Sequence, residues 1–415
     1  MTQHARPAAE AAAQRDAALS SDLRRLSPAF LDDPFPTYHL LRTHDPVHRC
    51  PDGSVFLTRY ADVAAVYRDK RMSSDKQVEF RPKFGDGGLW RHHTTSLVFN
   101  DPPYHDRVRR LLMPAFSART LKALEPGLVA LVERLLDEAA ARGGMDLITD
   151  FASAVPVEVI CNMLGVPRED RAPLRDYSLK ILRGLEPVIS ESMLAEGNRA
   201  VEDFSAYLDG LIRERRKRLN DDPADALSSL IRGEGEGEDA PFTQEELIQN
   251  CIFLLNAGHE TTTNLIGNGV AALIDFPDQL ALLQRQPELI DTAVEEFLRY
   301  ESSNQLGNRR VVEDAEVGGV AMPAGTLITL CIGAANRDPA VFADPDGLNI
   351  TRWPNRHLAF GAGIHACAGM HLARLEARVA IGRLVRRFPT IHRSGEFVRG
   401  GRARFRGYAS YPVSW

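Results

Sequence analysis

Most of the chain has apolar residues at the spacing of one helix face, and the pattern predicts a mainly α-helical protein. Between residues 115 and 235 it predicts helices over Ala118–Arg142, Pro156–Met163, Arg168–Arg183, Met193–Arg218 and Asp225–Arg232. Two further helices are expected. One begins after Thr243, whose hydroxyl can cap it. The other carries the apolar residues Leu372, Leu375 and Val379 and continues to Arg387.

Strand character is confined to a few short segments. Val55–Tyr60 is predicted as a strand and Ala61–Arg68 as the helix after it, while Glu316–Met322 and Thr326–Ile332 flank a Pro-Ala-Gly turn. The expected fold class is therefore mainly α with a smaller β-rich region (α+β). The segment Arg71–Val98 is long, polar and without clear periodicity, so we expect a functional or mobile loop there.

Composition narrows the class of protein. The chain has 415 residues, 44% of them hydrophobic, which is ample for a large core, and its net charge of −6 gives no general attraction to nucleic acid. Residues 1–24 contain no continuous apolar run, so we expect a flexible leader with no membrane span, followed by one domain over 25–415. The five cysteines are dispersed, which favours a reducing cytoplasm over a disulfide framework.

One stretch, residues 360–376, carries the strongest chemical signal. Cys367 lies between a glycine-spaced turn and a predicted helix, where free backbone N–H groups favour a thiolate. Gly363 and Gly369 can take positive φ and let a flat group approach the backbone closely. A lone thiolate presented in this way is a candidate axial ligand for haem iron. A buried structural cysteine in a glycine-rich loop is the alternative.

A second stretch breaks helix propensity in mid-helix. Ala257 and Gly258 leave room for a planar cofactor and a small ligand, and three consecutive threonines begin at Thr261. A threonine hydroxyl can donate to a backbone carbonyl of the preceding turn and loosen the helix there. Glu260 beside Thr261 places an acid next to an alcohol, which is a candidate proton relay.

A basic pair follows two prolines. His105 and Arg109 are four residues apart and share one helix face, where they can bind an anionic group such as a haem propionate. An exposed basic helix face is the alternative.

Together these stretches resemble the cytochrome P450 family. The sequence F-G-x-G-x-H-x-C-x-G followed by L-A-R-x-E is similar to that family's haem-binding loop, and A-G-x-E-T-T is similar to its oxygen-activation motif. The resemblance covers about residues 25–415, with four motifs in family order. It implies a P450 fold in which haem b lies between a long central helix and the cysteine loop.

The resemblance also implies roles for individual residues. Cys367 is the metal ligand, Glu260 and Thr261 are catalytic, and Arg309 binds a propionate, with Arg310 as the competing choice. The expected cofactor-binding residues are His105, Arg109, Ala257, Gly258, Arg309, Phe360, Gly361, Gly363, His365, Cys367 and Gly369.

Other expectations from the resemblance concern structure and pocket. Glu296, Arg299 and Arg352 are expected to form a buried ion-pair network below the haem. Pocket-wall candidates are Phe80, Phe84 and Trp90 in the predicted loop, and Asn304, Gln305 and Leu306 after Ser303. Ser303 stands where the family generally has proline, so the backbone path there is left open.

The implied function is a haem-thiolate monooxygenase that uses O2 and two electrons to oxidise a small organic substrate. The chain shows no fused redox domain, so the expected donors are a separate ferredoxin and ferredoxin reductase. A basic patch is a candidate docking face for the ferredoxin, with a generic basic face as the alternative: Arg107, Arg110, Arg374, Arg378, Arg383, Arg386 and Arg387. A peroxide-driven peroxygenase and a non-catalytic haem sensor are the alternative functions. We expect a bacterial, cytoplasmic enzyme that binds neither nucleic acid nor membrane.

Overall fold

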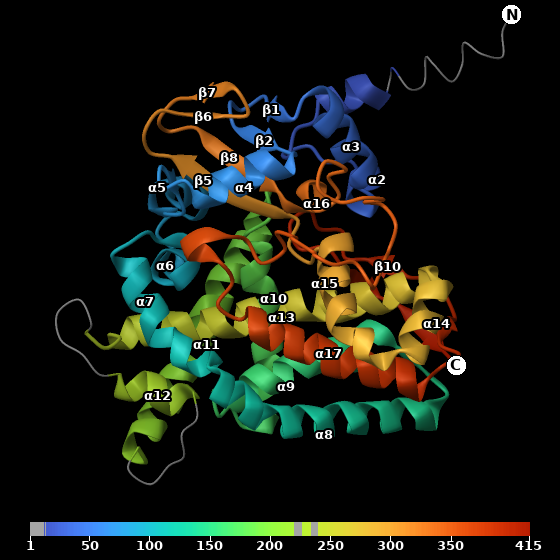
Figure 1. The fold of residues 1–415 in the computed structure, drawn as a ribbon. Coiled ribbons are helices and arrows are strands. Elements are labelled where there is room, and N and C mark those ends of the chain that lie inside the picture. Colours follow the sequence, from blue (N-terminus) through green and yellow to red (C-terminus); the bar gives the residue numbers. More distant parts are fainter. Residues whose placement is uncertain (1–11, 13, 220–225, 234–239) are drawn as a thin grey trace, which may run out of the picture.

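A computed structural model of the chain describes residues 12, 14–219, 226–233 and 240–415. Figure 1 shows the largest group of strands gathered with the first helices at one end of the molecule and the long helices filling the other end. The predicted fold class, mainly α with a smaller β-rich part, is confirmed. Within the described part of the chain, no helix combines enough length with enough apolar character to cross a lipid bilayer.

The helices, in chain order, are α2 (Pro28–Asp32), α3 (Phe35–His44), α4 (Tyr60–Arg68), α5 (Gln77–Phe84), α6 (Gly88–Thr95), α7 (Tyr104–Leu112), α8 (Ala118–Arg142), α9 (Ala154–Met163), α10 (Arg171–Arg183), α11 (Glu191–Lys217), α12 (Ala226–Arg232), α13 (Gln244–Asp275), α14 (Pro277–Arg285), α15 (Ile290–Tyr300), α16 (Ile332–Ala335) and α17 (Met370–Arg387). The helices predicted between residues 115 and 235 are all present, and α8 has the predicted bounds. The last of them was expected from Asp225, which lies outside the described residues.

The strands are β1 (Val47–Arg49), β2 (Val55–Leu57), β3 (Met72–Ser73), β4 (Gly144–Asp146), β5 (Leu306–Val311), β6 (Ala315–Val317), β7 (Val320–Met322), β8 (Leu327–Cys331), β9 (His392–Arg393), β10 (Val398–Arg399), β11 (Tyr408–Ser410) and β12 (Pro412–Ser414). The largest sheet has the order β1-β2-β8-β5-β3, with β2 and β8 parallel and the other pairs antiparallel. Strand β5 was not predicted, because its residues Asn308 and Arg309 are polar and border a cavity rather than an apolar core.

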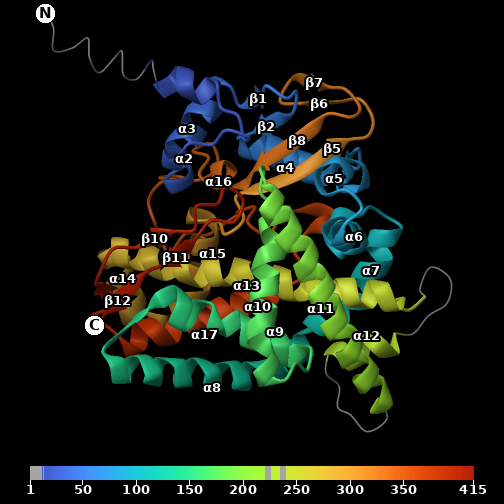
Figure 2. The same cartoon turned by 180° about the vertical axis from the view of Figure 1, so that it is seen from behind.

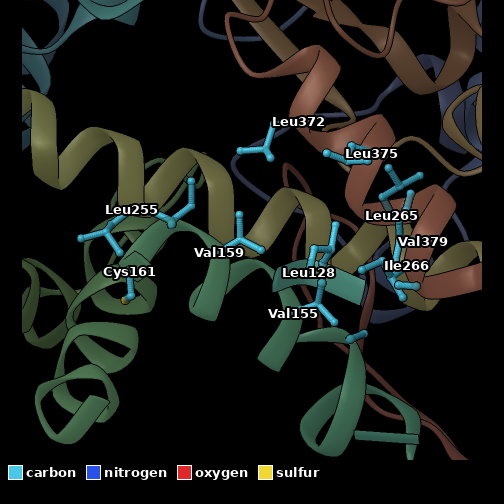
Figure 3. Packing of buried hydrophobic residues seen from close by; sticks show 14 of the residues in the cluster. Leu128, Val155, Val159, Cys161, Leu255, Leu265, Ile266, Leu372, Leu375 and Val379 are labelled. Atoms are coloured by element: carbon cyan, nitrogen blue, oxygen red, sulfur yellow. The ribbon is translucent and has the colours of Figure 1, made fainter. Parts of the chain in front are cut away.

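Helix α13 is the centre of the core. The Thr243 hydroxyl accepts the N–H of Glu246, and the Glu246 carboxylate accepts the N–H of Thr243 at 2.9 Å, so the predicted start is confirmed as a capping box. Helices α9, α15 and α17 pack against α13, and Figure 2 shows α10 and α11 lying across it. Figure 3 shows apolar side chains of α8, α9, α13 and α17 in one cluster; those labelled are Leu128, Val155, Val159, Cys161, Leu255, Leu265, Ile266, Leu372, Leu375 and Val379.

The segment Arg71–Val98 is not the unstructured loop that its sequence predicts, because it contains β3, α5 and α6. Both helices are short, and α5 carries an internal proline, so their pattern is weak and tertiary packing stabilises them. The Phe80 ring packs edge-on against Phe84 and Phe99, with ring centres 5.0 and 5.1 Å apart.

The expected flexible leader is ordered where the structure describes it. Residues 14–19 are helical, Ala18 is buried, and Leu19 and Leu23 pack against a small apolar cluster built around Phe35 and Tyr38. This part of residues 1–24 is therefore not frayed, and the reason is the apolar contact of its leucines. Residues 1–11 and 13 lie outside the described residues.

The predicted ion-pair network is confirmed. Glu296 and Arg299 have no solvent exposure, and the Arg299 guanidinium donates to both Glu296 oxygens at 2.7 and 2.8 Å. Arg352 Nε donates to Glu296 Oε2 at 3.0 Å. Arg299 also donates to the carbonyls of residues 336, 345 and 347, so the network attaches α15 to the chain segment that leads to Cys367.

Glu296→Gln is expected to lower the free energy of unfolding by about 3–5 kcal/mol, because two buried guanidiniums lose their counter-charge. Urea unfolding followed by far-UV circular dichroism measures the loss. The matched control is Glu138→Gln, which breaks the exposed pair with Arg134 on α8 and should cost only about 0.3–0.5 kcal/mol. Equal losses in the two variants would contradict a stabilising role for the buried network.

Candidate active site

One cavity of about 320 Å³ is lined by α13, by the loop that carries Cys367 and by segments from α6, α7, β5 and the C-terminal loop. It brings together most of the residues predicted from the sequence. Those that line it are His105, Arg109, Ala257, Gly258, Thr261, Arg309, Phe360, Gly361, His365, Cys367 and Gly369. Glu260 and Gly363 do not line it.

The Cys367 sulfur is presented as the sequence predicts, on a loop that leads into a helix N-terminus. Helix α17 begins at Met370 after Gly369, and the Cys367 N–H donates to the Phe360 carbonyl at 2.9 Å. Burial raises the pKa of the Cys367 thiol, while the Gly369 N–H, Arg109 and Arg374 oppose that rise by favouring the thiolate. Of the five cysteines, all of them described, only Cys367 lines the cavity, and the other four are buried elsewhere.

The two glycines named from the sequence differ in backbone conformation. Gly363 has φ of 73° and Gly361 has φ of 65°, but Gly369 has an ordinary φ of −88°. The reason is that Gly369 forms the first turn of α17, where any residue can adopt its conformation. The residues with left-handed backbone, Gly361 and Gly363, therefore both precede Cys367, and none of the glycines named here has this conformation after it.

Four basic side chains meet at one edge of the cavity: His105, Arg109, Arg309 and His365. His105 Nε2 is buried without a hydrogen-bond partner, and His365 Nε2 is 3.8 Å from Asp101 Oδ1, too far for a hydrogen bond. The guanidiniums donate only to backbone carbonyls, that of Arg109 to residue 366 at 2.9 Å and that of Arg309 to residue 308 at 2.8 Å. Arg310 instead faces Glu79 at 3.7 Å and does not line the cavity.

These groups fit haem b, which needs one axial ligand, a flat slot and positive charge for two propionates. The guanidiniums of Arg109 and Arg309 would supply that charge, the unpartnered Nε2 atoms of His105 and His365 would add hydrogen-bonding groups, and Cys367 would supply the ligand atom. Across the described residues, no cluster of three or more His, Cys, Asp or Glu side chains could hold a metal ion alone.

The middle of α13 leaves space above this slot. Ala257 and Gly258 line the cavity, and a Cβ atom on Gly258 would come within 2.8 Å of Ile160 Cγ1, so any larger residue there would require the Ile160 side chain to shift. The Thr261 hydroxyl donates to the Ala257 carbonyl at 2.6 Å, as predicted. Its oxygen keeps its acceptor capacity at the cavity wall.

Glu260 points away from the cavity. Its carboxylate pairs with Arg402, and Arg402 Nε also donates to Glu186 Oε1 at 2.9 Å. Burial raises the pKa of Glu260, and Arg402 acts in the opposite direction. The acid and the alcohol are adjacent in sequence, but only the alcohol lines the cavity, so the relay role of Glu260 stays a prediction.

A second acid, Glu376, was missed as a site residue. It lines the cavity from α17, and burial raises its pKa to about 8, against a smaller opposing effect of the Thr262 hydroxyl. Its Oε1 has no hydrogen-bond partner. The sequence feature that could have identified it is a carboxylate within the apolar face of a predicted helix.

The predicted aromatic wall is also wrong. Phe80, Phe84 and Trp90 do not line the cavity, because they pack on one another or on neighbouring segments behind it. The residues of this region that line the cavity are His92, His93, Ser96, Leu97, Val98 and Phe99. Burial lowers the pKa of His92 to about 4, so the ring is neutral at pH 7.

The polar run after Ser303 is divided between cavity and core. Ser303 and Asn304 line the cavity, as do Asn308 and Arg309, whereas Gln305 and Leu306 do not. The Gln305 side chain turns back to donate to the Ser302 carbonyl at 2.7 Å. Of the three pocket candidates named from this run, only Asn304 is confirmed as a lining residue.

The arginines expected to form a docking patch are largely paired. Arg374 donates to both oxygens of Glu295, and Arg378, Arg383 and Arg387 pair with acids on α8. Those acids are Glu125, Glu133 and Asp137. Arg107 pairs with Glu246. The row therefore holds α17 against α8 and α15, and little of its charge is left for a partner.

The fold and the cavity define a class of protein in which one cysteine thiolate holds haem beside a long central helix. The family model described as Cytochrome P450 matches residues 43–286 and 279–396. The chain belongs to the cytochrome P450 family.

Relatives support this assignment over nearly the whole chain. The chain is 38% identical to the biotin biosynthesis cytochrome P450 of Bacillus subtilis, covering 88% of this chain and 92% of that protein. It is 41% identical to the vitamin D(3) 25-hydroxylase of Pseudonocardia autotrophica, covering 86% and 87%. The crystal structure of P450BioI with an acyl carrier protein ligated to hexadec-9Z-enoic acid matches with a TM-score of 0.88 and 36% identity, covering 94% of this chain and all of that one. The chain is a cytochrome P450 monooxygenase, and its cofactor is haem b.

Glu376 should make stability fall as the pH rises. Its pKa is about 8 in the folded protein against an ordinary value of 4.5, so between these values the folded state holds one proton more than the unfolded state. The free energy of unfolding should drop by up to ~1.4 kcal/mol per pH unit across this window, and Glu376→Gln should remove that drop. Urea midpoints between pH 5 and 8.5 measure it. Equal pH slopes in wild type and variant would contradict the raised pKa, and Glu138→Gln is the exposed control.

Proposed function

We propose that this monooxygenase oxidises a small, largely apolar organic substrate with O2 and two electrons from a separate ferredoxin and ferredoxin reductase. The observation that carries the proposal is the single sulfur of Cys367 at the wall of a cavity with a basic edge. The bound haem supplies the oxygen-activating chemistry.

The chain's own residues hold the haem, orient the substrate and supply a proton. Cys367 supplies the axial thiolate, which the Gly369 N–H stabilises. His105, Arg109, Arg309 and His365 bind the two propionates at the edge of the cavity. The Thr261 hydroxyl of α13 is a proton donor at the cavity wall. The apolar lining keeps bulk water away from the substrate.

Separate electron donors are proposed because relatives of this length align almost end to end with the chain. The alignment takes in 92% of the Bacillus subtilis protein, which leaves no room there for a fused reductase. The arginine row of α17 gives little support to an acidic partner, because its charges are paired. A cytoplasmic location fits the five cysteines, none of which is in a disulfide.

The names of the relatives suggest different substrates for those proteins, since one is a vitamin D(3) hydroxylase and another was crystallised with a fatty acyl carrier protein. These names do not identify the substrate of this chain. The class of substrate has to be inferred from the residues that line the cavity.

Cys367→Ala tests the proposed ligand. The wild-type protein, reduced and exposed to carbon monoxide, should show the strongly red-shifted Soret band that thiolate ligation produces, and the variant should lose it. Cys331→Ala, which removes a buried sulfur outside the cavity, is the control. An unchanged band in Cys367→Ala, or a wild-type protein that binds no haem, would overturn the proposal.

Thr261→Ala should lower product formation per electron consumed by on the order of 10²-fold, because it removes the hydroxyl at the cavity wall. The matched control is Thr263→Ala, since Thr263 makes the same type of bond, to the His259 carbonyl at 2.9 Å, but does not line the cavity. Product and NADH are measured together with a ferredoxin system.

Equal coupling in the two variants would contradict the role of Thr261. Turnover with hydrogen peroxide alone, and none with the ferredoxin system, would identify a peroxygenase. A lack of substrate-dependent oxygen consumption across a broad panel of compounds would favour a haem sensor.

A further inference from the structure

Arg404 is a cation at the cavity wall that the haem site does not use. It lies in the loop between β10 and β11, and its backbone is fixed on both sides: its carbonyl accepts the Gln305 N–H at 2.8 Å, and its N–H donates to Glu186 Oε2 at 3.2 Å. Its side chain lines the cavity near Asn308 and His93. The guanidinium is therefore held in place by a braced backbone rather than by a mobile loop.

The Arg404 guanidinium has no counter-charge. Among the residues that the structure describes, no carboxylate lies within ion-pair distance of it, and its only hydrogen-bond acceptor is the neutral amide oxygen of Asn308. Its Nε is buried without a partner. An arginine placed in this way has donors left for a ligand, and leaving it unpaired in the cavity costs free energy.

The nearby acid Glu186 does not pair with the Arg404 guanidinium. Both oxygens of Glu186 are occupied, Oε1 by Arg402 Nε at 2.9 Å and Oε2 by the backbone N–H groups of Ala403 and Arg404. Lys83 adds a further positive charge nearby, and its Nζ donates to the Glu186 carbonyl at 2.6 Å. Burial lowers the pKa of Arg404, the charge of Glu186 opposes that effect, and Arg402 adds to it.

The haem does not require Arg404. Two propionates would meet four basic side chains, those of His105, Arg109, Arg309 and His365. Arg404 is thus a surplus cation, and much of the cavity lining beyond its polar neighbours is apolar. The apolar part of the lining includes Leu97, Phe99, Ile160, Leu182, Leu185 and Leu254.

We propose that Arg404, with Asn308 beside it, binds a carboxylate on the substrate, so that the enzyme selects organic acids with an apolar body. This inference rests on the proposed monooxygenase function and names its substrate class. A planar carboxylate matches the guanidinium fork and its single charge. The carboxylate fixes one end of the substrate, and the apolar wall then determines which carbon lies next to the haem.

The test uses the haem-loaded enzyme and straight-chain carboxylic acids from octanoic to hexadecanoic acid, each paired with its methyl ester. Dissociation constants are measured from the Soret shift that accompanies substrate entry. In the wild-type enzyme, at least one acid should bind on the order of 10-fold or more tightly than its ester. Arg404→Gln should raise the dissociation constant of that acid by about 10- to 100-fold and change that of the ester by less than about 3-fold.

Two further variants make the result specific. Arg404→Lys keeps the charge without the fork and should fall between wild type and Arg404→Gln. Arg399→Gln removes an arginine of the same C-terminal region that stacks on Tyr408, 4.2 Å from the ring centre, outside the cavity, and should leave acid binding unchanged.

Three results would overturn the inference. One is a wild-type enzyme that binds no acid more tightly than its ester. Another is equal weakening of acid and ester in Arg404→Gln. The third is loss of haem from that variant, which would make Arg404 a propionate ligand. The reduced carbon monoxide spectrum of each protein separates the two proposals: if the red-shifted band is present while acids are not preferred, only the inference about Arg404 fails, whereas absence of the band from the wild type overturns both.

Discussion

A carboxylate with no access to solvent, that of Glu296, fixes the position of the reactive sulfur. It balances Arg299 and Arg352, and it also accepts the Asn355 amide at 3.0 Å. Arg299 donates to the Asn336 carbonyl, and the Asn336 side chain accepts the N–H of Leu358 at 2.7 Å, two residues before the cysteine loop begins. These bonds are buried or partly buried, so together they attach the backbone between α15 and the loop at several points.

The neighbouring acid, Glu295, attaches α15 to the chain on the other side of Cys367. Glu295 accepts both Arg374 of α17 and His357, and although burial raises its pKa, these hydrogen bonds prevail and lower it to about 2. Helix α15 therefore holds both the chain before Cys367 and the helix after it. The sulfur lies between two charge-paired attachments, which explains why residues far from the cavity decide where its ligand atom points.

The same physical criterion separates structural from functional charges in this molecule. The arginines of α17 have carboxylate partners on α8 and α15, and they pack helices together. The guanidiniums of Arg109, Arg309 and Arg404 at the cavity have no carboxylate partner among the described residues. Residue type alone does not make this distinction, which is why the α17 arginines looked like a docking surface in the sequence.

What the sequence predicted well depended on local chemistry. Cys367, Gly363 and the pair Glu296–Arg299 each need a fixed residue at a fixed spacing, and a spacing can be read from one chain. Helix α8 was placed correctly because its apolar pattern is long. The helices α5 and α6 were not, because contacts with distant segments stabilise them, and no pattern within eight residues records such contacts.

Arg404 could not be predicted from the sequence, because its role also depends on contacts with distant segments. It becomes part of the site only when the C-terminal loop meets β5, which is about a hundred residues earlier in the chain, and its meaning depends on Glu186 already being occupied. Once there, the apolar wall that excludes water also lowers the local dielectric constant, so a charge at this position interacts far more strongly than one at the surface. The neutral rings of His92 and His93 add no competing charge, since burial keeps the pKa of both below 7. The strength of Arg404 as an anchor is therefore a property of the dry cavity around it as much as of the guanidinium itself.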